Sequence, residues 1–367
     1  MIEKIIEYSC RNKVLVILAF VALTAAGIWV VEHTPVDAIP DLSENQVIVF
    51  TDWMGRSPQE IEDQITYPLS VNLQGLAGVK AVRSSSEFNF SMINIIFDDS
   101  VEFYFARTRV LERLALASTF LPQGVVPYLA PDATALGQIF WYTVEGDNTD
   151  VGTLRSLQDW YVRYQLNSVP GVAQVSSVGG FPREYQVDVN PETLRAYDIT
   201  LGQLYDAIAN SNSSVGGRVV QKGNAEYIIR GVGWLRDVND IRNTVVTTRN
   251  DVPILVGDVA TVQMGSEFRR SILEKDGREV TGGVVMMRYG ENPLEVTKAI
   301  KAKLRDLQAG LPEGIRIVPF YDRTRLIEGA IDTVTRVLEH EMLFAALAIL
   351  LILLHFRSAL AVVITLP

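Results

Sequence analysis

The sequence predicts an α+β membrane protein in which membrane helices flank a large exported region built from repeated split βαβ units. Three observations lead to this fold class. An uncharged stretch of 18 residues, Val14 to Val31, nearly spans the hydrocarbon core of a bilayer as a helix. A second apolar run covers residues 342–356. Between the two runs, one order of strands and helices occurs twice.

The first apolar run is predicted to be an uncleaved membrane helix within residues 1–36. A secretory signal peptide is the alternative, but the following residues, EHTPVDAIPD, contain no small-residue cleavage site. Lys4, Arg11 and Lys13 lie on one side of this run, and Arg357 flanks the second. The positive-inside rule therefore places both flanks in the cytoplasm and the intervening chain outside.

The end of the sequence predicts a truncation. A third apolar run, ALAVVITLP, follows Ser358 and stops at Pro367 inside what we expect to be a membrane segment. We therefore assign residues 333–367 to the second membrane helix and the start of a third, with more helices beyond. The 33 basic and 43 acidic residues argue against nucleic acid as a partner. Cys10, the single cysteine, precedes the first helix, so the exported part can form no disulfide.

The first repeat unit begins with an alternating stretch, residues 45–53, that predicts a strand. Ser57 and Pro58 are typical of a helix N-cap and first helical position, and we expect that helix to run to about Leu76. Two strands at 79–87 and 89–97 form the predicted hairpin. A helix over residues 101–120 then ends before Pro122.

The second unit starts with a strand at 138–144 and a helix at about 150–169, followed by a turn at Pro170 and Gly171. The strings LAGVKAV (76–82) and VPGVAQV (169–175) fall at equivalent places in the two units, which supports an internal repeat. The rest of the second unit occurs much later, as a strand at 283–288, a helix at 292–309 and a strand at 315–319. Residues 183–271 are therefore an insert.

The insert contains a strand (YQVDV), a helix near 201–211 and a hairpin-like stretch from Gly216 to Arg230. The hairpin is built around Lys222, Gly223 and Asn224. A polar hairpin tip can be a solvated loop or an arm that reaches another subunit. From the residues alone we prefer the solvated loop, since loop tips usually lie at the surface.

Several strings, in order along the chain, resemble the heavy-metal efflux subclass of the resistance-nodulation-division (RND) transporter family. They are TPVDAIPDLSENQV (34–47), TYPL (66–69), YFAR (104–107), APDATALG (130–137), LRSLQDW (154–160), SVGGFPREYQV (177–187), YDRTRLI (321–327) and FRSAL (356–360). Each string alone is unspecific, but together they cover the whole chain. The chain is therefore identified as an N-terminal fragment of a member of this family.

The resemblance implies a proton-driven secondary transporter, not an enzyme, that exports heavy-metal cations. It implies a multi-pass protein of the cell inner membrane with a large periplasmic domain, which contacts membrane lipid and forms a homotrimer. A periplasmic adaptor protein and an outer-membrane channel are the expected partners, and no cofactor is expected. The family's proton-carrying acidic residues belong to a later membrane helix, beyond Pro367.

The family's subdomains imply a division of this chain. Residues 37–134 would form the first porter subdomain, and residues 135–182 with 272–332 the second. Both would have a ferredoxin-like split βαβ fold. Residues 183–271 would form an inserted docking subdomain. In the family, the hairpin that corresponds to Gly216 to Arg230 is an intersubunit arm. The resemblance therefore reverses the preference for a solvated loop at Lys222, Gly223 and Asn224.

Metal transport directs attention to methionines as soft ligands. Met54, Met92, Met264, Met286 and Met287 lie in the exported region, and core filling is the preferred interpretation for each. Met286 and Met287 are adjacent on a predicted strand and so face opposite sides. Only Met264 is kept as a candidate metal ligand.

The stretch MGSEFRR (264–270) resembles copper-binding and silver-binding members, but there we expect a methionine at the position of Phe268. A phenylalanine cannot bind metal, so this departure counts against copper or silver and leaves zinc, cobalt, nickel or cadmium open. His33, His340 and His355 lie at membrane boundaries without a second ligand at metal-site spacing, and we interpret them as interfacial.

Two acidic pairs have two interpretations. Asp37 and Asp41 follow the first membrane helix, and Asp98 and Asp99 close the predicted hairpin. Turn chemistry is the preferred explanation, and an electronegative path for cations is the alternative. The sequence contains no phosphate-binding loop, nucleophile motif or ordered metal-ligand set, so we do not expect ATP to supply the energy within this segment.

Two other functions share some of these features. A membrane sensor with a periplasmic ligand-binding domain predicts a long polar helix after the second membrane helix, whereas here the chain re-enters an apolar run. An RND exporter of organic compounds has the same architecture but needs an aromatic-lined pocket, which sequence cannot test.

Overall fold

The computed structural model describes residues 7–9, 11–269, 271–353 and 356. The third apolar run and His355 lie outside the described residues. The chain divides into two compact units. Unit 1 comprises residues 1–143, 162–177 and 283–367, and unit 2 comprises residues 144–161 and 178–282.

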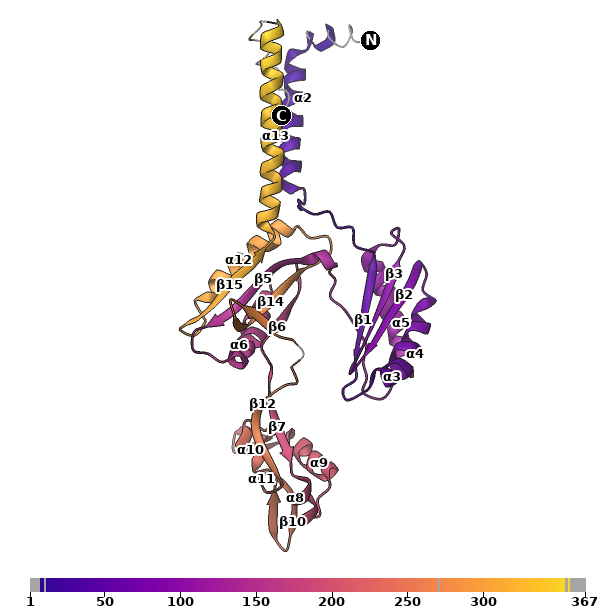
Figure 1. Ribbon diagram of the computed structural model, residues 1–367, viewed down its shortest axis with the longest axis vertical. Helices are drawn as coiled ribbons and strands as arrows, with labels where there is room; N and C mark the ends of the chain where they lie inside the picture. Colours follow the sequence, from indigo (N-terminus) through magenta and orange to yellow (C-terminus); the bar gives the residue numbers. More distant parts are fainter. Residues whose placement is uncertain (1–6, 10, 270, 354–355, 357–367) are drawn as a thin grey trace. The chain divides into compact units, whose positions relative to one another are not determined.

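Unit 1 contains two long helices, α2 (Lys13–His33) and α13 (Thr324–Leu353). In the part of the chain that the structure describes, α2 is the one helix long and apolar enough to cross a membrane, and no protein covers its apolar stretch, Lys13–Val31. Helix α13 starts with mixed polar and apolar residues and includes the second apolar run up to its described end. Both helices are single uninterrupted coils (Figure 1).

The first sheet of unit 1 has the order β2-β3-β1-β4, and every pairing is antiparallel. Its strands are β1 (Gln46–Asp52), β2 (Val79–Glu87), β3 (Phe90–Phe97) and β4 (Tyr128–Leu129). Its helices are α3 (Pro58–Ile61), the π-helical turn η1 (Glu62–Thr66), α4 (Tyr67–Gln74), α5 (Phe103–Ala117) and the 3₁₀ turn η2 (Ser118–Phe120). Figure 1 shows the helices on one face of this sheet.

The core of this subdomain lies between that sheet face and the helices. Alternate residues of β1 and β3 are fully buried, as period-two alternation requires. They pack with apolar residues of the helices: Val47, Val49, Ile93 and Ile95 against Ile61, Ile65, Leu69, Leu73, Val110 and Leu114. At the start of the first helix, Ser57 and Glu60 form the reciprocal hydrogen bonds of a capping box.

The second sheet has the order β13-β14-β5-β15, and β6 also pairs with β14. Its strands are β5 (Gln138–Gly146), β6 (Val172–Gly179), β13 (Leu273–Lys275), β14 (Arg278–Met287) and β15 (Ile315–Asp322). The associated helices are η3 (Ala135–Gly137), α6 (Val151–Leu157), the π-helical turn η4 (Gln158–Val162), α7 (Arg163–Leu166) and α12 (Pro293–Gln308).

The two sheets repeat one topology. The order β6-β14-β5-β15 corresponds strand for strand to β2-β3-β1-β4. The first helix of each repeat copy contains a π-helical turn. This confirms the predicted internal repeat and the interruption of its second copy. The expected limits of the individual subdomains stay a prediction.

Two glycines show the repeat at the level of atoms. Gly78 and Gly171 have φ of +79° and +81°, and each directly precedes the second strand of its repeat copy. A Cβ atom at Gly78 would lie 2.6 Å from Val101 Cγ2, and one at Gly171 would lie 2.5 Å from Val296 Cγ2. The short match between the two strings therefore reflects one backbone conformation and one close contact, which only glycine allows.

Unit 2 contains the insert. Strands β7 (Arg183–Val189) and β12 (Ala260–Ser266) pair, as do β10 (Val245–Arg249) and β11 (Val252–Leu255). With α8 (Pro191–Ala196), α9 (Leu201–Ser211), α10 (Val238–Arg242) and α11 (Val256–Val259) they enclose a small core around Leu204, Ile241, Val256, Val259 and Val262. Among the strands that the structure describes, β8 (Ser213–Lys222) and β9 (Ala225–Gly233) pair with each other alone.

Several predicted elements differ from the observed ones. Strand β14 starts five residues before the predicted strand, because a hairpin through Asp276 and Gly277 pairs it with the short β13, which sequence patterning missed. The strands β10 and β11 of the insert were also not predicted. Each is only four or five residues long, and such segments have too few positions to establish a period.

Candidate functional site

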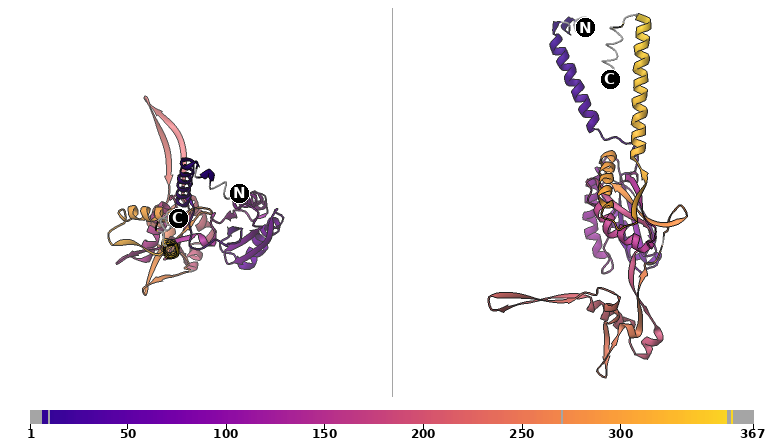
Figure 2. Two further views of the ribbon diagram at one scale, coloured as in Figure 1. Left: turned by 90° about the horizontal axis from the view of Figure 1, so that it is seen from above. Right: turned by 90° about the vertical axis from the view of Figure 1, so that its left-hand side faces the viewer.

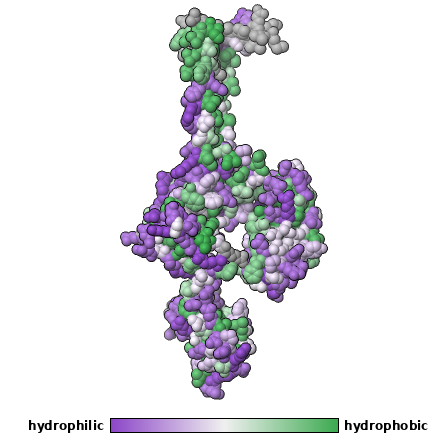
Figure 3. All heavy atoms as spheres, in the orientation of Figure 1, coloured by the Kyte–Doolittle hydropathy of each residue, from purple (hydrophilic) through white to green (hydrophobic). Residues whose placement is uncertain are grey.

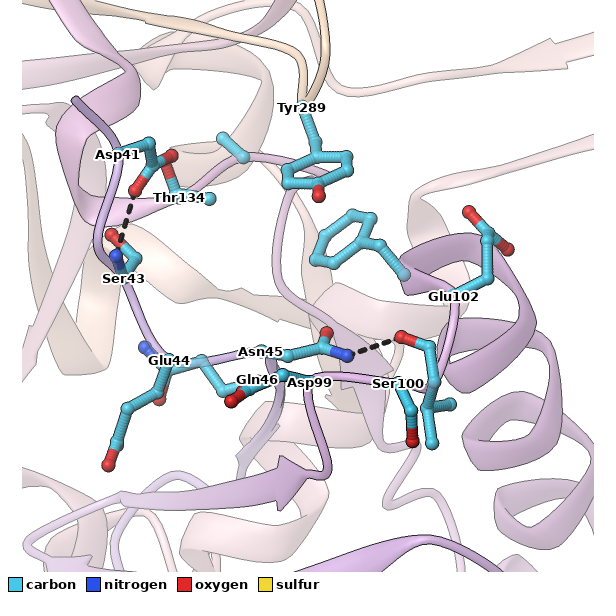
Figure 4. Close-up of a pocket in the computed structure, with 13 residues that line it drawn as sticks. Asp41, Ser43, Glu44, Asn45, Gln46, Asp99, Ser100, Glu102, Thr134 and Tyr289 are labelled. Atoms are coloured by element: carbon cyan, nitrogen blue, oxygen red, sulfur yellow. Dashed lines mark hydrogen bonds between the residues drawn. The ribbon is translucent and has the colours of Figure 1, made fainter.

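An acidic pocket in unit 1 is the candidate functional site (Figure 4). Its volume is about 420 Å³. The lining residues come from the linker before β1, the loop between β3 and α5, the segment before β5 and the residue Tyr289 after β14. Four of them are acidic and none is basic: the carboxylates belong to Asp41, Glu44, Asp99 and Glu102.

Asp41 is fixed by two of the strings singled out in the sequence. Its Oδ1 accepts a hydrogen bond from the Ser43 amide at 3.0 Å, and its Oδ2 accepts one from Thr134 Oγ1 at 2.6 Å. Burial would raise the pKa of Asp41, but the hydrogen bonds from Ser43 and Thr134, with the charge of Arg323, outweigh it and hold the pKa below its ordinary value. Asp41 is therefore ionised at neutral pH.

Glu102 occupies the N-cap position of α5. Its carboxylate accepts hydrogen bonds from the amides of Tyr104 and Phe105 at 2.9 and 2.6 Å. These bonds satisfy two of the free amides at the start of the helix, where a negative charge is favoured. Glu102 thus contributes charge to the pocket while its oxygens are engaged by the helix.

Asn45 holds two walls of the pocket together. Its Nδ2 donates to the carbonyl oxygens of Val101 at 2.6 Å and Asp98 at 3.3 Å, so the start of β1 is tied to the loop before α5 (Figure 4). The Asn45 Oδ1 atom is buried and accepts no hydrogen bond from the described residues. This geometry fixes the position of the neighbouring Glu44 and Gln46.

An aromatic pair forms another wall. The rings of Phe103 and Tyr289 stack with their centroids 4.4 Å apart. The Tyr289 amide donates to the Asp132 carbonyl at 2.8 Å, and the Tyr104 hydroxyl donates to the Asp132 carboxylate at 3.3 Å. Arg107 donates to two carbonyls in the same segment. The segment that carries Thr134 is therefore held rigidly against α5.

The electrostatics of the pocket favour a cation. Two basic residues near its acidic groups form long ion pairs: Arg83 with Glu44 at 3.7 Å, and Lys80 with Asp99 at 3.7 Å. Both pairs are well exposed, so solvent and salt screen them strongly. No group of three or more His, Cys, Asp or Glu among the described residues could hold a metal ion. The four carboxylates of the lining thus give the pocket an electrostatic attraction for cations.

The structure gives Asp37 and Asp41 different partners, whereas Asp98 and Asp99 share Lys80 as an ion-pair partner. Asp41 and Asp99 line the same pocket. Asp37 instead pairs with Arg323, and Asp98 pairs with Lys80 at 3.4 Å. The turn interpretation holds for Asp41, since it bonds the Ser43 amide, and that role is compatible with a place in the pocket wall. Sequence reasoning missed Glu44 and Glu102, although both lie in or beside strings that it singled out.

Among the described residues, no group of His, Cys, Asp or Glu could hold a metal ion beside Met264. Met264 lies on β12 opposite Tyr185, and 49% of its surface is exposed. Core filling, which we expected for every exported methionine, is wrong for Met264 and for Met54, which is 69% exposed. The reason is that Met54 lies in the turn after β1, and that Met264 lies on a two-stranded sheet whose outer face is uncovered.

The tip residues Lys222, Gly223 and Asn224 lie at the end of the β8–β9 hairpin, which projects from the rest of unit 2 in the right-hand view of Figure 2. Gly223 has φ of +66°, as a tight two-residue turn requires. The hairpin is exposed on both faces, and each face carries large apolar side chains: Val219 and Ile228 on one, Val220 and Tyr227 on the other.

Comparisons with known proteins agree along the whole chain. The AcrB/AcrD/AcrF family profile matches residues 5–367. The chain is 44% identical to "Putative cation efflux system protein SilA" of Salmonella typhimurium and 37% identical to "Cobalt-zinc-cadmium resistance protein CzcA" of Cupriavidus metallidurans, covering 100% of this chain and 35% of each relative. A crystal structure of a heavy metal efflux pump matches with 32% identity and a TM-score of 0.90, covering 97% of this chain and 36% of that one. The chain thus spans about a third of the length of these relatives.

Proposed function

The chain belongs to the AcrB/AcrD/AcrF family of RND transporters, and on this premise we propose that it is the first part of a proton-driven pump that exports heavy-metal cations. The observation that carries a cation as the substrate is the acidic pocket, whose lining includes four carboxylates and no basic side chain. Such a lining raises the local concentration of cations and repels anions. The family match, together with this lining, favours a cation transporter over an enzyme or a sensor.

The proposed setting is the cell inner membrane, with α2 and the apolar part of α13 crossing the bilayer and in contact with lipid. Support comes from the apolar, uncovered surface of α2. Figure 3 shows apolar residues gathered at the upper end of the helices, whereas polar residues are frequent on the lower part of the helices and over the folded parts below. The region between the helices would then lie in the periplasm, and proton antiport would depend on residues outside this chain.

The proposed assembly is a homotrimer that works with a periplasmic adaptor protein and an outer-membrane channel. Support for the homotrimer comes from the β8–β9 hairpin. A two-stranded hairpin that is apolar on both faces is marginal in water by itself and gains stability when another surface covers it. We propose that this hairpin, with Lys222, Gly223 and Asn224 at its tip, is the arm that inserts into a neighbouring subunit.

The chemistry of the described residues favours a divalent cation over copper(I) or silver. Oxygen ligands line the pocket, and Phe268 stands where a soft methionine ligand is expected in a copper or silver pump. Phe268 is 81% exposed, so its side chain is not required to fill a core. Zinc, cobalt, nickel and cadmium are the proposed substrates.

A growth assay tests this function. The full-length parent protein is expressed with its adaptor in a metal-sensitive bacterium, which is challenged with zinc, cobalt, nickel, cadmium, copper and silver. Resistance to divalent metals is expected. Resistance to copper or silver alone would overturn the choice of substrate, and no resistance despite protein in the membrane would favour an exporter of organic compounds.

A further inference from the structure

Arg323 joins three segments of unit 1 at the point where β15 ends and α13 begins. It is 2% exposed. Its Nε donates to Asp37 Oδ1 at 2.9 Å, and its Nη2 lies 2.8 Å from Asp37 Oδ2. The third guanidinium nitrogen, Nη1, donates to the carbonyl oxygen of Leu136. The side chain thus contacts the linker that follows α2 and the turn that precedes β5.

The backbone of Arg323 adds two further links. Its amide donates to the carbonyl of Ile139 in β5 at 3.1 Å, and its carbonyl accepts from the Ile327 amide in the first turn of α13 at 3.1 Å. Ile327 is fully buried. The start of the helix is therefore fastened both to a central strand and to the linker.

Such a junction resists independent movement of its parts. The planar guanidinium makes a two-point contact with a carboxylate, which fixes orientation as well as distance. Because the charge is buried, separating the pair would leave it without compensation. Next to it, Asp322 accepts from Lys301 Nζ of α12 at 2.5 Å and from the Thr324 amide at 3.0 Å, which braces the same turn.

The segments held by Arg323 are also walls of the acidic pocket. Asp41 lies four residues after Asp37 in the same linker, and Thr134, which hydrogen-bonds Asp41, lies two residues before Leu136. Arg323 itself does not line the pocket. It is therefore placed to act on the pocket through its neighbours and not by touching a cation.

We infer that Arg323 is a positioning residue that transmits displacement of α13 to the acidic pocket. When α13 shifts, the linker at Asp37 and the turn at Leu136 move with it, and the wall formed by Asp41 and Thr134 is rearranged. This inference rests on the proposed function, because transport is the process in which such a displacement has an effect.

Transport by the full-length parent protein in proteoliposomes tests the inference. Initial rates of zinc transport, or of the divalent metal to which wild type confers resistance, are measured under an imposed pH gradient as a function of metal concentration. Arg323→Gln, Arg323→Lys and Asp37→Asn are expected to lower kcat at least tenfold and to change KM less than twofold. Arg336→Gln is the matched control, since Arg336 forms an exposed ion pair with Asp332 on the same helix. It is expected to transport like wild type.

The outcomes separate the two proposals. Absence of metal transport by the wild-type protein contradicts the proposed function. The inference is overturned if wild type transports metal and Asp37→Asn and Arg323→Lys have a normal kcat. It is also overturned if KM in these variants rises by the same factor as kcat falls. If Arg323→Gln fails to assemble, the two conservative variants still decide, because each keeps a polar group of similar size.

Hydrogen exchange tests the mechanical link without transport. In Asp37→Asn, the amides of residues 136–139 and 324–328 are expected to exchange about tenfold faster together, while those of the β1–β3 pair are unchanged. Faster exchange at only one of the two segments would show that Arg323 does not connect them.

Discussion

Arg183 Nη2 lies 2.9 and 2.8 Å from the two carboxylate oxygens of Asp150, and so joins the first strand of the insert to the N-cap of α6. The Thr153 hydroxyl donates to the same carboxylate at 2.5 Å. The hydrogen bond from Thr153, followed by that from Arg183, lowers the pKa of Asp150 from 3.8 to about 2, although burial acts in the opposite direction.

This pair predicts an acid-dependent loss of stability. The pKa is lower in the folded than in the unfolded state, so the stabilisation is present above pH 3.8 and is lost as pH falls towards about 2. Asp150→Ala is expected to lower the free energy of unfolding by about 1 kcal/mol at pH 7, since it removes an N-cap. Asp150→Asn keeps the cap, and its smaller effect should vanish below about pH 2. Thermal unfolding of wild type and both variants between pH 7 and pH 2 measures these effects. If the stability difference between wild type and Asp150→Asn does not change with pH, the lowered pKa of Asp150 is contradicted.

The paired glycines of the repeat predict unequal costs of an added methyl group. Gly78→Ala and Gly171→Ala introduce a Cβ within 2.6 Å of a valine as well as a positive φ. Gly124→Ala is the control, because Gly124 has φ of +84° but open space around it. The control should cost about 1 kcal/mol from backbone strain alone, and the other two about 1–3 kcal/mol more from the clash. Equal costs in denaturant unfolding would show that the valines move aside freely.

The two-faced hairpin predicts that its apolar residues hold the oligomer together. Val219→Asp combined with Ile228→Asp places two charges on one face and should shift the detergent-solubilised full-length parent protein from the proposed trimer to monomer at micromolar concentration. The matched change on the polar pair beside it, Gln221→Ala with Glu226→Ala, should leave the trimer intact. Light scattering after size-exclusion chromatography distinguishes the species, and an intact trimer in the first variant would argue for a solvated loop.

The charge of the pocket predicts a salt-dependent effect on uptake of the cation. Glu44→Gln combined with Asp99→Asn should raise KM for metal transport about threefold at low ionic strength, with little change above about 0.5 M salt, because screening then removes the attraction. Glu62→Gln with Asp63→Asn removes the same charge from the exposed turn η1 and serves as control. A rise in KM of the same size in both double variants would mean that only net charge matters.

The half-exposed position of Met264 predicts that its sulfur is dispensable for metal resistance. Met264→Leu preserves the size and apolar character of the side chain but removes the sulfur. Metal resistance and the metal that is selected should not change, because Met264 is half exposed on β12 opposite Tyr185, and the described residues show no group of His, Cys, Asp or Glu that could hold a metal ion beside it. A loss of resistance greater than tenfold, with normal protein levels, would identify Met264 as a ligand.

The local elements could be predicted because their signals depend on near neighbours. Ser57 and Pro58 start the first helix where the sequence indicates, and the structure adds the reciprocal hydrogen bonds between Ser57 and Glu60. The repeat was predicted mainly from the shared order of elements, and the strings around Gly78 and Gly171 supported it, since one backbone conformation requires glycine at both places. The interruption of the second copy followed from the order of elements alone.

The sequence by itself thus determined the repeated α+β architecture, the apolar first helix and the resemblance to a transporter family, because periodicity, capping and turn residues act over a few positions. Only the tertiary structure decided which acidic residues meet in one pocket and which are neutralised. Asp41 and Asp99 come together, while Asp37 is taken by Arg323, 286 residues later in the chain. Such pairings depend on how distant segments pack and on which charges burial leaves without water, and no local pattern records either.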